Sequence, residues 1–419
     1  MHSATAKPQA EMKCPPIRVL HYFAFPGGGI GRYVHELLSR MHTVPDLAVE
    51  LACVPSYHFL GNAPYPVWPG LRDITHPNPL RRRIRFAVNL VVNPLRAIAR
   101  AQATGAHILH LSTIPHVTFA FWRRRLDRTG IKLVATAHDV RRSQGLISLR
   151  YELEQLRRLY RRCEALFVHS EFQKKDLIDF AGVCPERVYV VPHGPYYHGP
   201  PQADKETLRR RYGVPLEKQV VLFFGDIRPD KNLDLFLRAM VPYKDRLFLV
   251  VAGQAKQGIS IQSLQQLAHQ LDIQDSIKWI PYYVPYEEVP NLFELSDWLA
   301  LPYSKTFTSQ SGVLNVAIAH RLPVLACALP TIRETLDQCR IGIYVTPDSI
   351  ADLQHGIREM LNLTPAGQFD GFERAQNLFS WEKNVTIAME VYSALGSRRG
   401  VSRVVSDLPC NPVEGRERM

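Results

Sequence analysis

The chain lacks several motifs that would assign it to common enzyme classes. It contains no Gly-Lys-Ser/Thr, which excludes a P-loop, and no Gly-x-Ser-x-Gly, so the nucleophile turn of a hydrolase is not indicated. No Asp-x-Asp occurs either, so we expect no divalent metal held by such a carboxylate pair. No stretch approaches the roughly 18 to 20 apolar residues of a membrane span, and residues 1–16 lack the apolar core of a signal peptide.

Cysteine is scarce and shows no pattern. The seven cysteines are scattered, odd in number and form no Cys-x-x-Cys pair, so we expect reduced thiols in a cytosolic protein and no zinc site. The chain has 419 residues, of which 46% are hydrophobic and 21% charged. These values are typical of a soluble globular enzyme with two domains.

Acidic residues are too few in the first half to balance its basic ones. Residues 1–199 hold 27 Lys and Arg against 14 Asp and Glu, whereas residues 200–419 hold 24 against 25, so the net charge of +12 comes from the first half. Such asymmetry indicates an anionic partner, which can be a phosphorylated substrate, a membrane surface or nucleic acid. The alternative for any single cluster is a solvated helix face. The main clusters are Arg81–Arg83 with Arg85, Arg123–Arg125 with Arg128, and Arg157–Arg158 with Arg161–Arg162.

Short apolar runs alternate with amphipathic stretches twice along the chain, which predicts parallel strands joined by crossover helices. The first set ends at Pro192-His193-Gly194-Pro195, and the Pro-rich residues up to Ala203 are typical of a hinge. We therefore predict an α/β protein with two doubly wound, Rossmann-like domains that face a cleft. The predicted divisions are a disordered tail at 1–16, a first domain at 17–197, a hinge at 198–203, a second domain at 204–375, a terminal helix at 376–396 and a disordered tail at 397–419.

A glycine-rich turn lies between the first predicted strand and helix. Gly28, Gly29 and Gly31 would let the backbone approach a ligand closely, and free amides at the start of the helix attract anions. The spacing does not fit the dinucleotide fingerprint, because Arg32 and Val34 stand where it needs glycine. The alternative is a tight structural turn.

A second turn follows the apolar run of residues 220–224. Gly225 begins this turn, which carries Arg228 and Lys231, and an amphipathic stretch comes next. Ligands bind at the carboxyl ends of parallel strands, where an Arg fork and a Lys point charge suit phosphate groups. The alternative is that both cations are solvated and paired with Asp226 and Asp230.

Two further candidates follow predicted strands. In the second half, Thr308, Ser309, Gln310, Ser311, Gly312 and Val313 precede a helix whose first amides can hold a diphosphate. The alternative is an ordinary serine N-cap. In the first half, His138 follows a strand and would face the cleft, where it can bond a substrate hydroxyl. The alternative is a loop histidine bonded to backbone.

In their order and spacing, these motifs resemble the retaining glycosyltransferases of family 4 (glycosyl transferases group 1), which have the two-domain GT-B fold. The resemblance extends from Ile17 to about Leu395. The residues that carry it are Gly27–Val34, Thr136–Asp139, Val168–Phe172, Val191–Gly194, Gly225–Asn232, Val250–Gly253, Ser309–Val313, Leu322–Val324 and Phe379–Trp381.

The resemblance implies roles for several of these residues. The glycine turn would contact the donor, His138 would bond a hydroxyl of the transferred sugar, and Arg228 and Lys231 would neutralise the leaving diphosphate. No enzyme nucleophile is required in this family, in which the leaving phosphate is thought to take the proton of the acceptor. The helix that begins near Trp381 would return to the first domain.

The chain departs from the family pattern at two places. Many members carry Glu, seven residues and Glu before the Pro-Val strand, whereas Thr308 and Val316 stand at these positions here. The chain thus resembles a subgroup with a Gln-Ser-Gly-Val turn. The residue after Gly225 is Asp226 rather than the usual Arg, and we interpret Arg228 as its replacement.

The expected activity is transfer of a hexose from a nucleotide-diphospho-sugar, without cofactor or metal, to a lipid-linked or glycan acceptor in cell-surface polysaccharide biosynthesis. Arg81, Arg82, Arg83 and Arg85 alternate with apolar residues, as in a helix that lies on an anionic membrane. We therefore expect a cytoplasmic protein that is peripheral at the inner face of the membrane. The alternatives are a sugar-nucleotide epimerase, a phosphorylase or a non-catalytic nucleotide-sugar-binding protein. Nucleic-acid binding is not expected, because no recognition helix or RNA-stacking motif is present.

Overall fold

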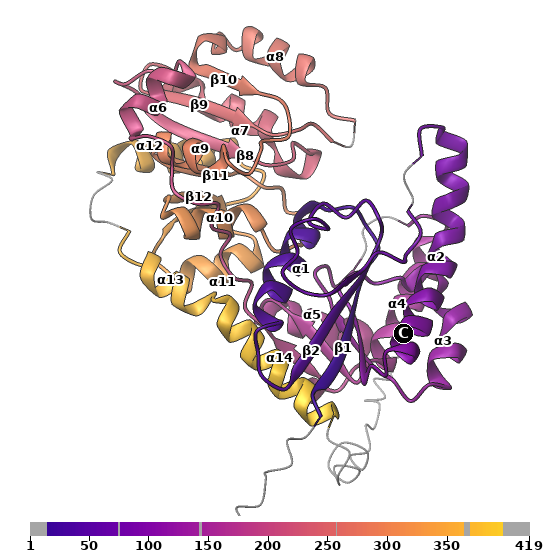
Figure 1. Cartoon of the computed structure of the whole chain (residues 1–419). Helices are drawn as coiled ribbons and strands as arrows, with labels where there is room; N and C mark the ends of the chain where they lie inside the picture. The colour runs from indigo at the N-terminus through magenta and orange to yellow at the C-terminus, as the bar shows by residue number, and fades with distance from the viewer. Residues whose placement is uncertain (1–14, 74–75, 142–144, 257, 364–368, 397–419) are drawn as a thin grey trace, which may run out of the picture.

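The computed structural model describes residues 15–73, 76–141, 145–256, 258–363 and 369–396. Two parallel sheets with flanking helices form two lobes, one above the other (Figure 1). The predicted α/β fold with two doubly wound units is therefore confirmed. The predicted tails fall almost wholly outside the described residues.

The first lobe contains a seven-stranded sheet in the order β3-β2-β1-β4-β5-β6-β7, in which every pair of neighbours is parallel. Its strands are β1 (Ile17–Phe23), β2 (Leu47–Cys53), β3 (Val67–Trp68), β4 (Ile108–Leu111), β5 (Lys132–Thr136), β6 (Ala165–Val168) and β7 (Val188–Val190). Its helices are α1 (Gly28–Met41), α2 (Pro79–Ala103), η1 (His116–Thr118), α3 (Phe119–Asp127), α4 (Leu149–Arg162), α5 (Glu171–Ala181) and η2 (Pro185–Arg187).

The second lobe contains a six-stranded parallel sheet in the order β10-β9-β8-β11-β12-β13. Its strands are β8 (Gln219–Phe224), β9 (Leu247–Ala252), β10 (Ile277–Ile280), β11 (Trp298–Leu301), β12 (Val324–Cys327) and β13 (Gly342–Val345). Its helices are α6 (Lys205–Tyr212), η3 (Pro229–Lys231), α7 (Leu233–Met240), η4 (Val241–Tyr243), α8 (Ile261–Gln270), η5 (Gln274–Ser276), α9 (Val289–Leu295), α10 (Gly312–His320), α11 (Pro330–Gln338), α12 (Ile350–Asn362) and α13 (Phe372–Leu378).

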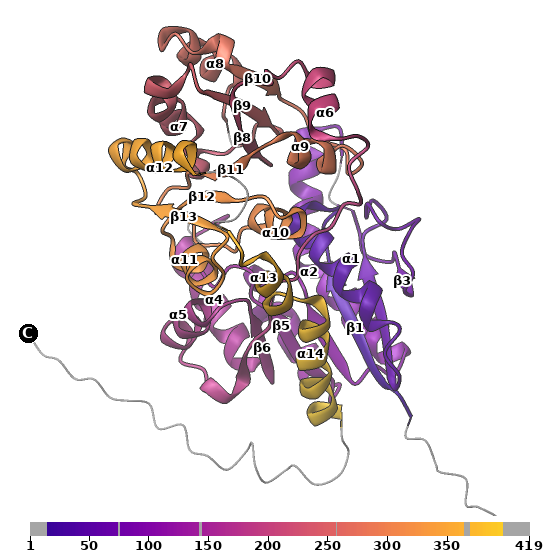
Figure 2. The same ribbon diagram turned by 90° about the vertical axis from the view of Figure 1, so that its left-hand side faces the viewer.

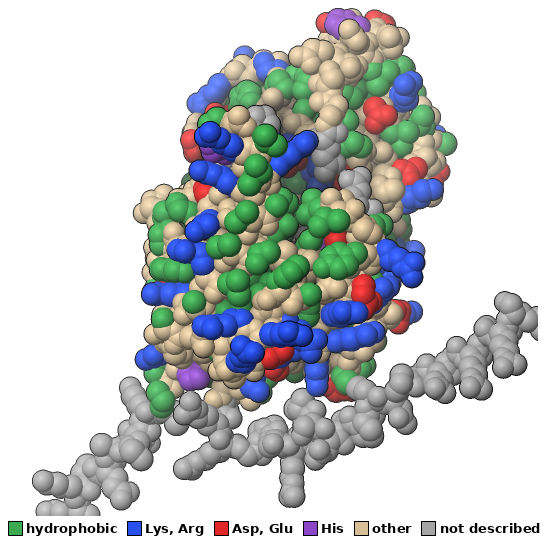
Figure 3. Space-filling view, turned by 90° about the vertical axis from the view of Figure 1, so that its right-hand side faces the viewer, with side chains coloured by type: hydrophobic (Ala, Val, Ile, Leu, Met, Phe, Trp, Pro, Cys, Tyr) green, Lys and Arg blue, Asp and Glu red, His purple; other side chains and the backbone are tan. Residues whose placement is uncertain are grey.

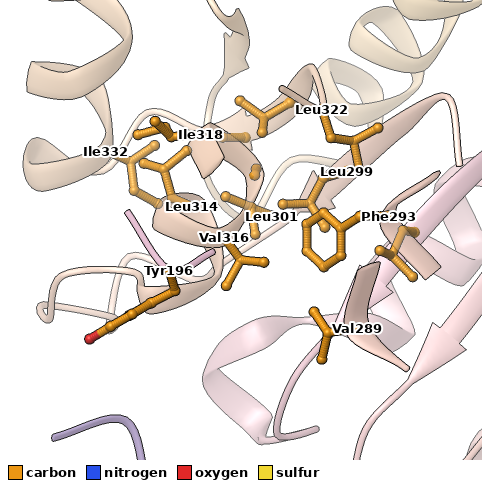
Figure 4. Close-up of a cluster of buried hydrophobic side chains, with 14 of the residues drawn as sticks. Tyr196, Val289, Phe293, Leu299, Leu301, Leu314, Val316, Ile318, Leu322 and Ile332 are labelled. Carbon is orange, nitrogen blue, oxygen red and sulfur yellow. The ribbon is translucent and has the colours of Figure 1, made fainter. Parts of the chain in front are cut away.

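The central strands are apolar throughout because helices cover both faces of each sheet. All six residues of β9 and all four of β11 are buried. Helix α10 packs its apolar residues against this sheet in the cluster that Figure 4 shows, in which Leu314 and Ile318 lie with Leu299 and Leu301. This packing holds the first turn of α10 rigidly at the edge of the sheet.

The last helix, α14 (Trp381–Gly396), returns from the second lobe to the first, as expected, although it begins at Trp381 after a break that follows α13 (Figure 2). Its Trp381 donates a hydrogen bond from Nε1 to the Pro195 carbonyl, at 2.9 Å. Tyr392 lies within the first lobe, where its hydroxyl bonds His110 Nδ1. The two lobes are thus joined twice, by residues 191–204 and by α14. Hinge motion at 198–203 stays a prediction.

From the sequence we expected no membrane-spanning segment and no disulfide. Among the described helices, none has the length and apolar character that crossing a membrane requires. Cys53, Cys163, Cys327 and Cys339 are buried and free. Cys184 is disulfide-bonded, so the expectation of reduced thiols is wrong at that residue.

Candidate active site

The turn after β8 is built on two glycines that no other residue can replace. Gly225 has φ +92°, which disfavours any side chain. Gly253 follows β9 with φ +155°, and a Cβ there would lie 1.9 Å from the Gly225 carbonyl oxygen. The two turns therefore touch backbone to backbone. This close approach places Gly225 and the residues after it at the mouth of the cleft.

Both predicted cations lie in this cleft, but their environments differ. Lys231 is 6% exposed and its Nζ lies 5.3 Å from the centre of the Tyr303 ring. It forms no ion pair with any residue that the structure describes. Arg228 pairs with Asp230 at 3.1 Å, which agrees with the alternative that the cations of this turn are paired with its acidic residues. Its Nε, however, has no hydrogen-bond partner among the described residues. A buried Lys without a counter-ion is unfavourable alone, which makes Lys231 the stronger sign of an anionic ligand.

The start of α10 lies beside these cations. Ser311 is the N-cap, whose Oγ accepts a hydrogen bond from Leu314 N, so the serine cap and the predicted site coincide. The turn lines the cleft through the residues Ser309, Gln310, Ser311, Gly312 and Val313. Thr308 was predicted to bind the donor with them, but it does not line this cavity, and its contact with a donor stays a prediction. It is exposed and lies outside the cavity, because the neighbouring Phe307 turns inward instead.

The glycine turn of the first lobe faces the same cavity in part. Gly28 (φ +83°) and Gly29 line it, and a Cβ at either position would meet no atom within 4 Å, so a ligand has room there. Gly31 does not line it, and its predicted donor contact stays a prediction. Gly31 lies on the inner face of α1, where a Cβ would stand 3.1 Å from Phe23. Its small size serves packing of α1 on β1.

A chain of hydrogen bonds fixes the protonation of His138. His169 Nδ1 lies 3.2 Å from the Val191 carbonyl, to which it can only donate. Burial lowers the pKa of His169 to about 4, so its Nε2 carries a lone pair and accepts from His138 Nδ1–H at 3.0 Å. Burial, with the nearby His169 and His193, holds the pKa of His138 well below its ordinary value.

Nε2 of His138 therefore carries a lone pair, and it has no partner among the described residues. His138 lines two adjoining cavities, of which one is the cleft between the lobes. The histidine presents a hydrogen-bond acceptor of fixed orientation there, which suits a ligand hydroxyl. The alternative, a loop histidine bonded to backbone, does not describe His138, because its Nδ1 bonds the side chain of His169.

The cleft cavity has a volume of ≈ 450 Å³ and is lined from both lobes. Contacts across it hold the lobes together. Ser309 Oγ donates to Asp139 Oδ1, and Gln310 Nε2 lies 3.5 Å from the His169 carbonyl. The Arg32 guanidinium lies 4.9 Å from the centre of the Tyr286 ring in the opposite lobe. The cavity size is ordinary for a ligand site.

The sequence reasoning missed the aromatic and apolar wall of the cleft. Tyr283, Tyr286 and Val289 line it from the segment after β10. Val316, which stands at the second Glu position of the family pattern that the sequence resembles, is 5% exposed and points toward Val289 and Phe293 (Figure 4). The position of that carboxylate is therefore apolar in this chain. No sequence signal marks such a wall, because its residues are ordinary core types.

The remaining predicted residues lie elsewhere. Arg81, Arg82, Arg83 and Arg85 are exposed on the first turns of α2, which projects from the first lobe, and they line none of the cavities described here (Figure 1). Within the described part of the chain, no cluster of His, Cys, Asp and Glu can hold a metal ion. Metal independence stays a prediction.

Replacing His169 by Phe should weaken the action of His138, although His169 itself does not line the cleft. The variant removes the acceptor of the His138 Nδ1 proton, and an unpaired buried donor costs about 1–3 kcal/mol, or about fivefold to 150-fold in rate if it acts at the transition state. We expect kcat to fall in this range and the donor KM to change little. His269→Phe, at an exposed position on α8, is the control. An unchanged kcat in His169→Phe would show that the hydrogen bond from His138 to His169 does not contribute to the reaction.

Two family models match the chain. Residues 27–195 match the model described as Glycosyltransferase Family 4, and residues 204–369 match Glycosyl transferases group 1. Together the two models cover most of both lobes. They also cover the glycine turn, His138, the turn with Arg228 and Lys231, and the turn before α10.

Known proteins are similar in sequence and in fold. The "D-inositol 3-phosphate glycosyltransferase" of Mycolicibacterium smegmatis is 27% identical over 284 residues, which are 65% of this chain and 64% of that protein. A glycosyltransferase structure from Rickettsia africae has a TM-score of 0.71 at 17% identity and covers 92% of this chain and 100% of that one. Anabaena Alr3699/HepE, solved with UDP and glucose, has a TM-score of 0.70 at 17% identity over 90% of this chain and 100% of that one.

Proposed function

The chain belongs to the group 1 glycosyltransferases of GT-B fold, and from this membership we propose that it is a retaining enzyme that transfers a hexose from a nucleotide-diphospho-sugar. The acceptor is a lipid-linked or glycan hydroxyl. The observation that carries the proposal is the buried Lys231, which shares one cavity with Arg228 and the amides that open α10. These are the groups that a diphosphate requires.

The diphosphate lies between Arg228, Lys231 and the first amides of α10. Its negative charge grows as the bond from the sugar C1 to the phosphate oxygen breaks. Groups that are already in place stabilise this charge without reorganisation, and such stabilisation usually contributes more to catalysis than any other single effect. Lys231 supplies a point charge, while Arg228 keeps Nε and one Nη free of its bond to Asp230.

The sugar lies against His138. Its Nε2 accepts a hydrogen bond from a sugar hydroxyl and so orients C1 toward the acceptor. The acceptor oxygen attacks C1 on the face that the phosphate leaves, the new C1–O bond replaces the old one, and the acceptor proton passes to the leaving phosphate oxygen. No side chain forms a covalent bond, and configuration is retained.

The nucleoside extends from the diphosphate along the aromatic wall of the second lobe. Tyr283, which is 56% exposed, offers a ring face on which a base can stack, whereas Arg32 and His198 already lie against the Tyr286 ring. The apolar Val289 and Val316 line the same cavity. Without a carboxylate at Val316, the ribose hydroxyls have no charged acceptor at that place.

A panel of UDP-, GDP- and ADP-sugars tests the proposal. We expect one donor to raise the unfolding midpoint, because a ligand that binds only the folded state at 100 times its Kd adds about 2.7 kcal/mol of stability. UDP-glucose is the first choice, since the similar Anabaena protein was solved with UDP and glucose. The same donor must also release nucleotide when an acceptor is present. No stabilisation by any donor would contradict the proposal, and a sugar converted without any acceptor would indicate an epimerase.

The exposed half of α2 supports peripheral membrane binding as the second part of the proposal. Leu80, Ile84 and Val88 are 67%, 56% and 44% exposed and stand four residues apart, so they form one stripe on the helix. Arg81 and Arg83 neighbour this stripe on the helix surface, with Arg85 farther round and Arg82 on the opposite face. From this side, hydrophobic side chains gather over the first lobe with Lys and Arg at their margins (Figure 3). Such a helix suits the interface of an anionic membrane, which we place at the cytoplasmic face.

Flotation with lipid vesicles tests the membrane contact. We expect binding to vesicles that contain phosphatidylglycerol, weaker binding in high salt, and little binding to phosphatidylcholine alone. The double variant Arg81→Gln with Arg82→Gln should bind about 30-fold more weakly, because each basic residue near an anionic surface contributes about 1 kcal/mol. Arg210→Gln with Arg211→Gln, on the second lobe, is the matched control. Equal binding of both double variants would contradict the role of α2.

A further inference from the structure

The first lobe contains a second cavity that adjoins the cleft. It has a volume of ≈ 600 Å³ and lies among α2, η1, α4 and the ends of the central strands. Ile30, His138 and Asp139 line both cavities. A molecule in the second cavity can therefore place one hydroxyl beside the sugar that His138 orients. On the proposed function, this cavity receives the acceptor, and the chemistry of its lining decides which acceptor fits.

The lining contains no Lys or Arg among the residues that the structure describes. It does contain two carboxylates, Asp139 and Glu152, of which Glu152 is 2% exposed. An acceptor phosphate or carboxylate would lie near these charges in a region of low dielectric, and no Lys or Arg of the described lining would compensate it. His116 also lines the cavity, but its Nε2 lies 3.7 Å from Glu152 Oε2 and so faces that carboxylate. The donor cavity differs, because Arg32, Arg228 and Lys231 line it.

Several hydrogen-bond donors of the lining, which could otherwise hold an anion, are already engaged. Glu152 Oε1 accepts hydrogen bonds from the amides of Leu146 (2.5 Å) and Ile147 (2.8 Å), so the loop before α4 binds a carboxylate of the chain itself. Asn89 Nδ2 donates to the carbonyls of Arg72 and Asp73. Asn93 Nδ2 also donates to the Arg72 carbonyl. These amides and Asn side chains are therefore taken, while the Asp139 and Glu152 carboxylates remain as acceptors in the lining.

Acceptor groups and apolar walls together select a neutral, hydroxylated molecule. Sugar hydroxyls donate hydrogen bonds to carboxylate groups such as those of Asp139 and Glu152. The apolar part of the lining suits a sugar face or an apolar aglycone. It comprises Phe25, Ile30, Phe86, Leu90, Ile114, Val117, Leu146 and Leu156.

We infer that the part of the acceptor that enters this cavity is an uncharged sugar or polyol with an apolar group attached, and that phosphorylated or carboxylated acceptors are rejected. The inference rests on the proposed function. It separates this chain from a phosphorylated acceptor such as the inositol phosphate in the name of the similar Mycolicibacterium protein. Anionic parts of a lipid-linked acceptor, where present, then lie outside, near the arginines of α2.

Matched pairs of acceptors test the inference. The probes are octyl glucoside with octyl glucuronide, octyl galactoside with octyl galacturonide, and inositol with inositol 1-phosphate, each below its critical micelle concentration and each with the donor that stabilises the protein. Nucleotide release is measured above the rate of donor hydrolysis. We expect the neutral member of at least one glycoside pair to have a kcat/KM at least about tenfold above that of its charged partner.

The variant Glu152→Gln adds a second readout. It keeps the shape of the side chain and an oxygen for the loop amides but removes the charge, so the ratio of neutral to charged kcat/KM should fall at least about threefold. Glu154→Gln, on the exposed side of the same helix where Glu154 pairs with Arg158 at 2.9 Å, should leave the ratio unchanged. If Glu152→Gln does not fold, the matched pairs on the unaltered protein decide alone.

The outcomes separate the two proposals. Equal or greater turnover of the charged members, or turnover of none of the glycosides while the donor still binds, overturns the neutral acceptor and leaves the glycosyltransferase proposal in place. Failure of every nucleotide-sugar to bind overturns the proposed function itself.

Discussion

Replacing Lys231 by alanine should lower kcat by about 10²–10³-fold, the usual loss when one preorganised group that stabilises a developing anion is removed. The side chain is buried, faces the cleft and has no counter-ion among the described residues, so the diphosphate is its natural partner. The fold should persist, because removing an unpaired buried charge relieves a desolvation cost. The measurements are steady-state kinetics with the stabilising donor and the unfolding midpoint without it.

A lysine of the same lobe provides the control for this variant. Lys244 lies outside the cleft and pairs with Asp272 at 2.5 Å on the surface, so Lys244→Ala should leave kcat unchanged. Arg228→Ala should also lose turnover, although Arg228 is already half engaged by Asp230. Wild-type kcat in Lys231→Ala would show that no diphosphate charge develops at this position.

Acid should unfold the protein steeply, because its buried histidines are neutral in the folded state. Burial lowers the pKa of His21 and His193 to about 3 and that of His169 to about 4, whereas the unfolded side chains titrate near 6.5. Between these values the unfolded state binds more protons, so stability falls as pH falls from about 6.5 toward 4. Each group contributes about 1.4 kcal/mol per pH unit, so these three alone give a slope of about 4 kcal/mol per unit.

Urea titrations at pH 7, 6 and 5 measure this slope. His21→Phe is the matched variant, because His21 stacks on His110 at 4.5 Å, lies outside both cavities and can be replaced by another ring. Its slope should be smaller by about 1.4 kcal/mol per pH unit. A stability that does not change between pH 7 and pH 5 would show that these histidines are protonated or solvated in the folded protein.

The fold was predictable because its signals are local and repeated. Every strand except β3 follows from an apolar run, and β3 has only two residues within a proline-rich connection. Helix α6 was missed because only Leu208 and Arg209 are buried in it, so no apolar period shows. Its capping residues could have predicted it. Asp204 accepts a hydrogen bond from Thr207 N at the start of the helix, and Gly213 ends the helix in the left-handed conformation.

The site was predictable where a rule about topology applied. His138 and Lys231 follow the ends of parallel strands or the turns beside them, and both line the cleft. The same rule applies to His169 and His193, which directly follow β6 and come shortly after β7, but their roles depend on hydrogen bonds between loops that no sequence pattern encodes. What the sequence did not predict was the direction in which an individual side chain faces.

Thr308 illustrates this limit. Its neighbours on both sides face the cavity, and only the inward turn of Phe307 sends it outward. Gly31 is a similar case, since the helix that carries it rotates it toward Phe23. In both cases the segment lies where it was expected, and only the direction in which the residue faces differs from the expectation.

The course of α14 determines how the protein can be divided. Asn384 Nδ2 donates to the Tyr33 hydroxyl and to the Pro192 carbonyl, and Tyr392 bonds His110, so three polar groups of the first lobe are satisfied by the last helix. A fragment cut after residue 197 would leave these groups orphaned beneath an uncovered apolar surface. The amino-terminal half is therefore not a portable module, and a split version of the enzyme would need residues 381–396 supplied as a complementing peptide.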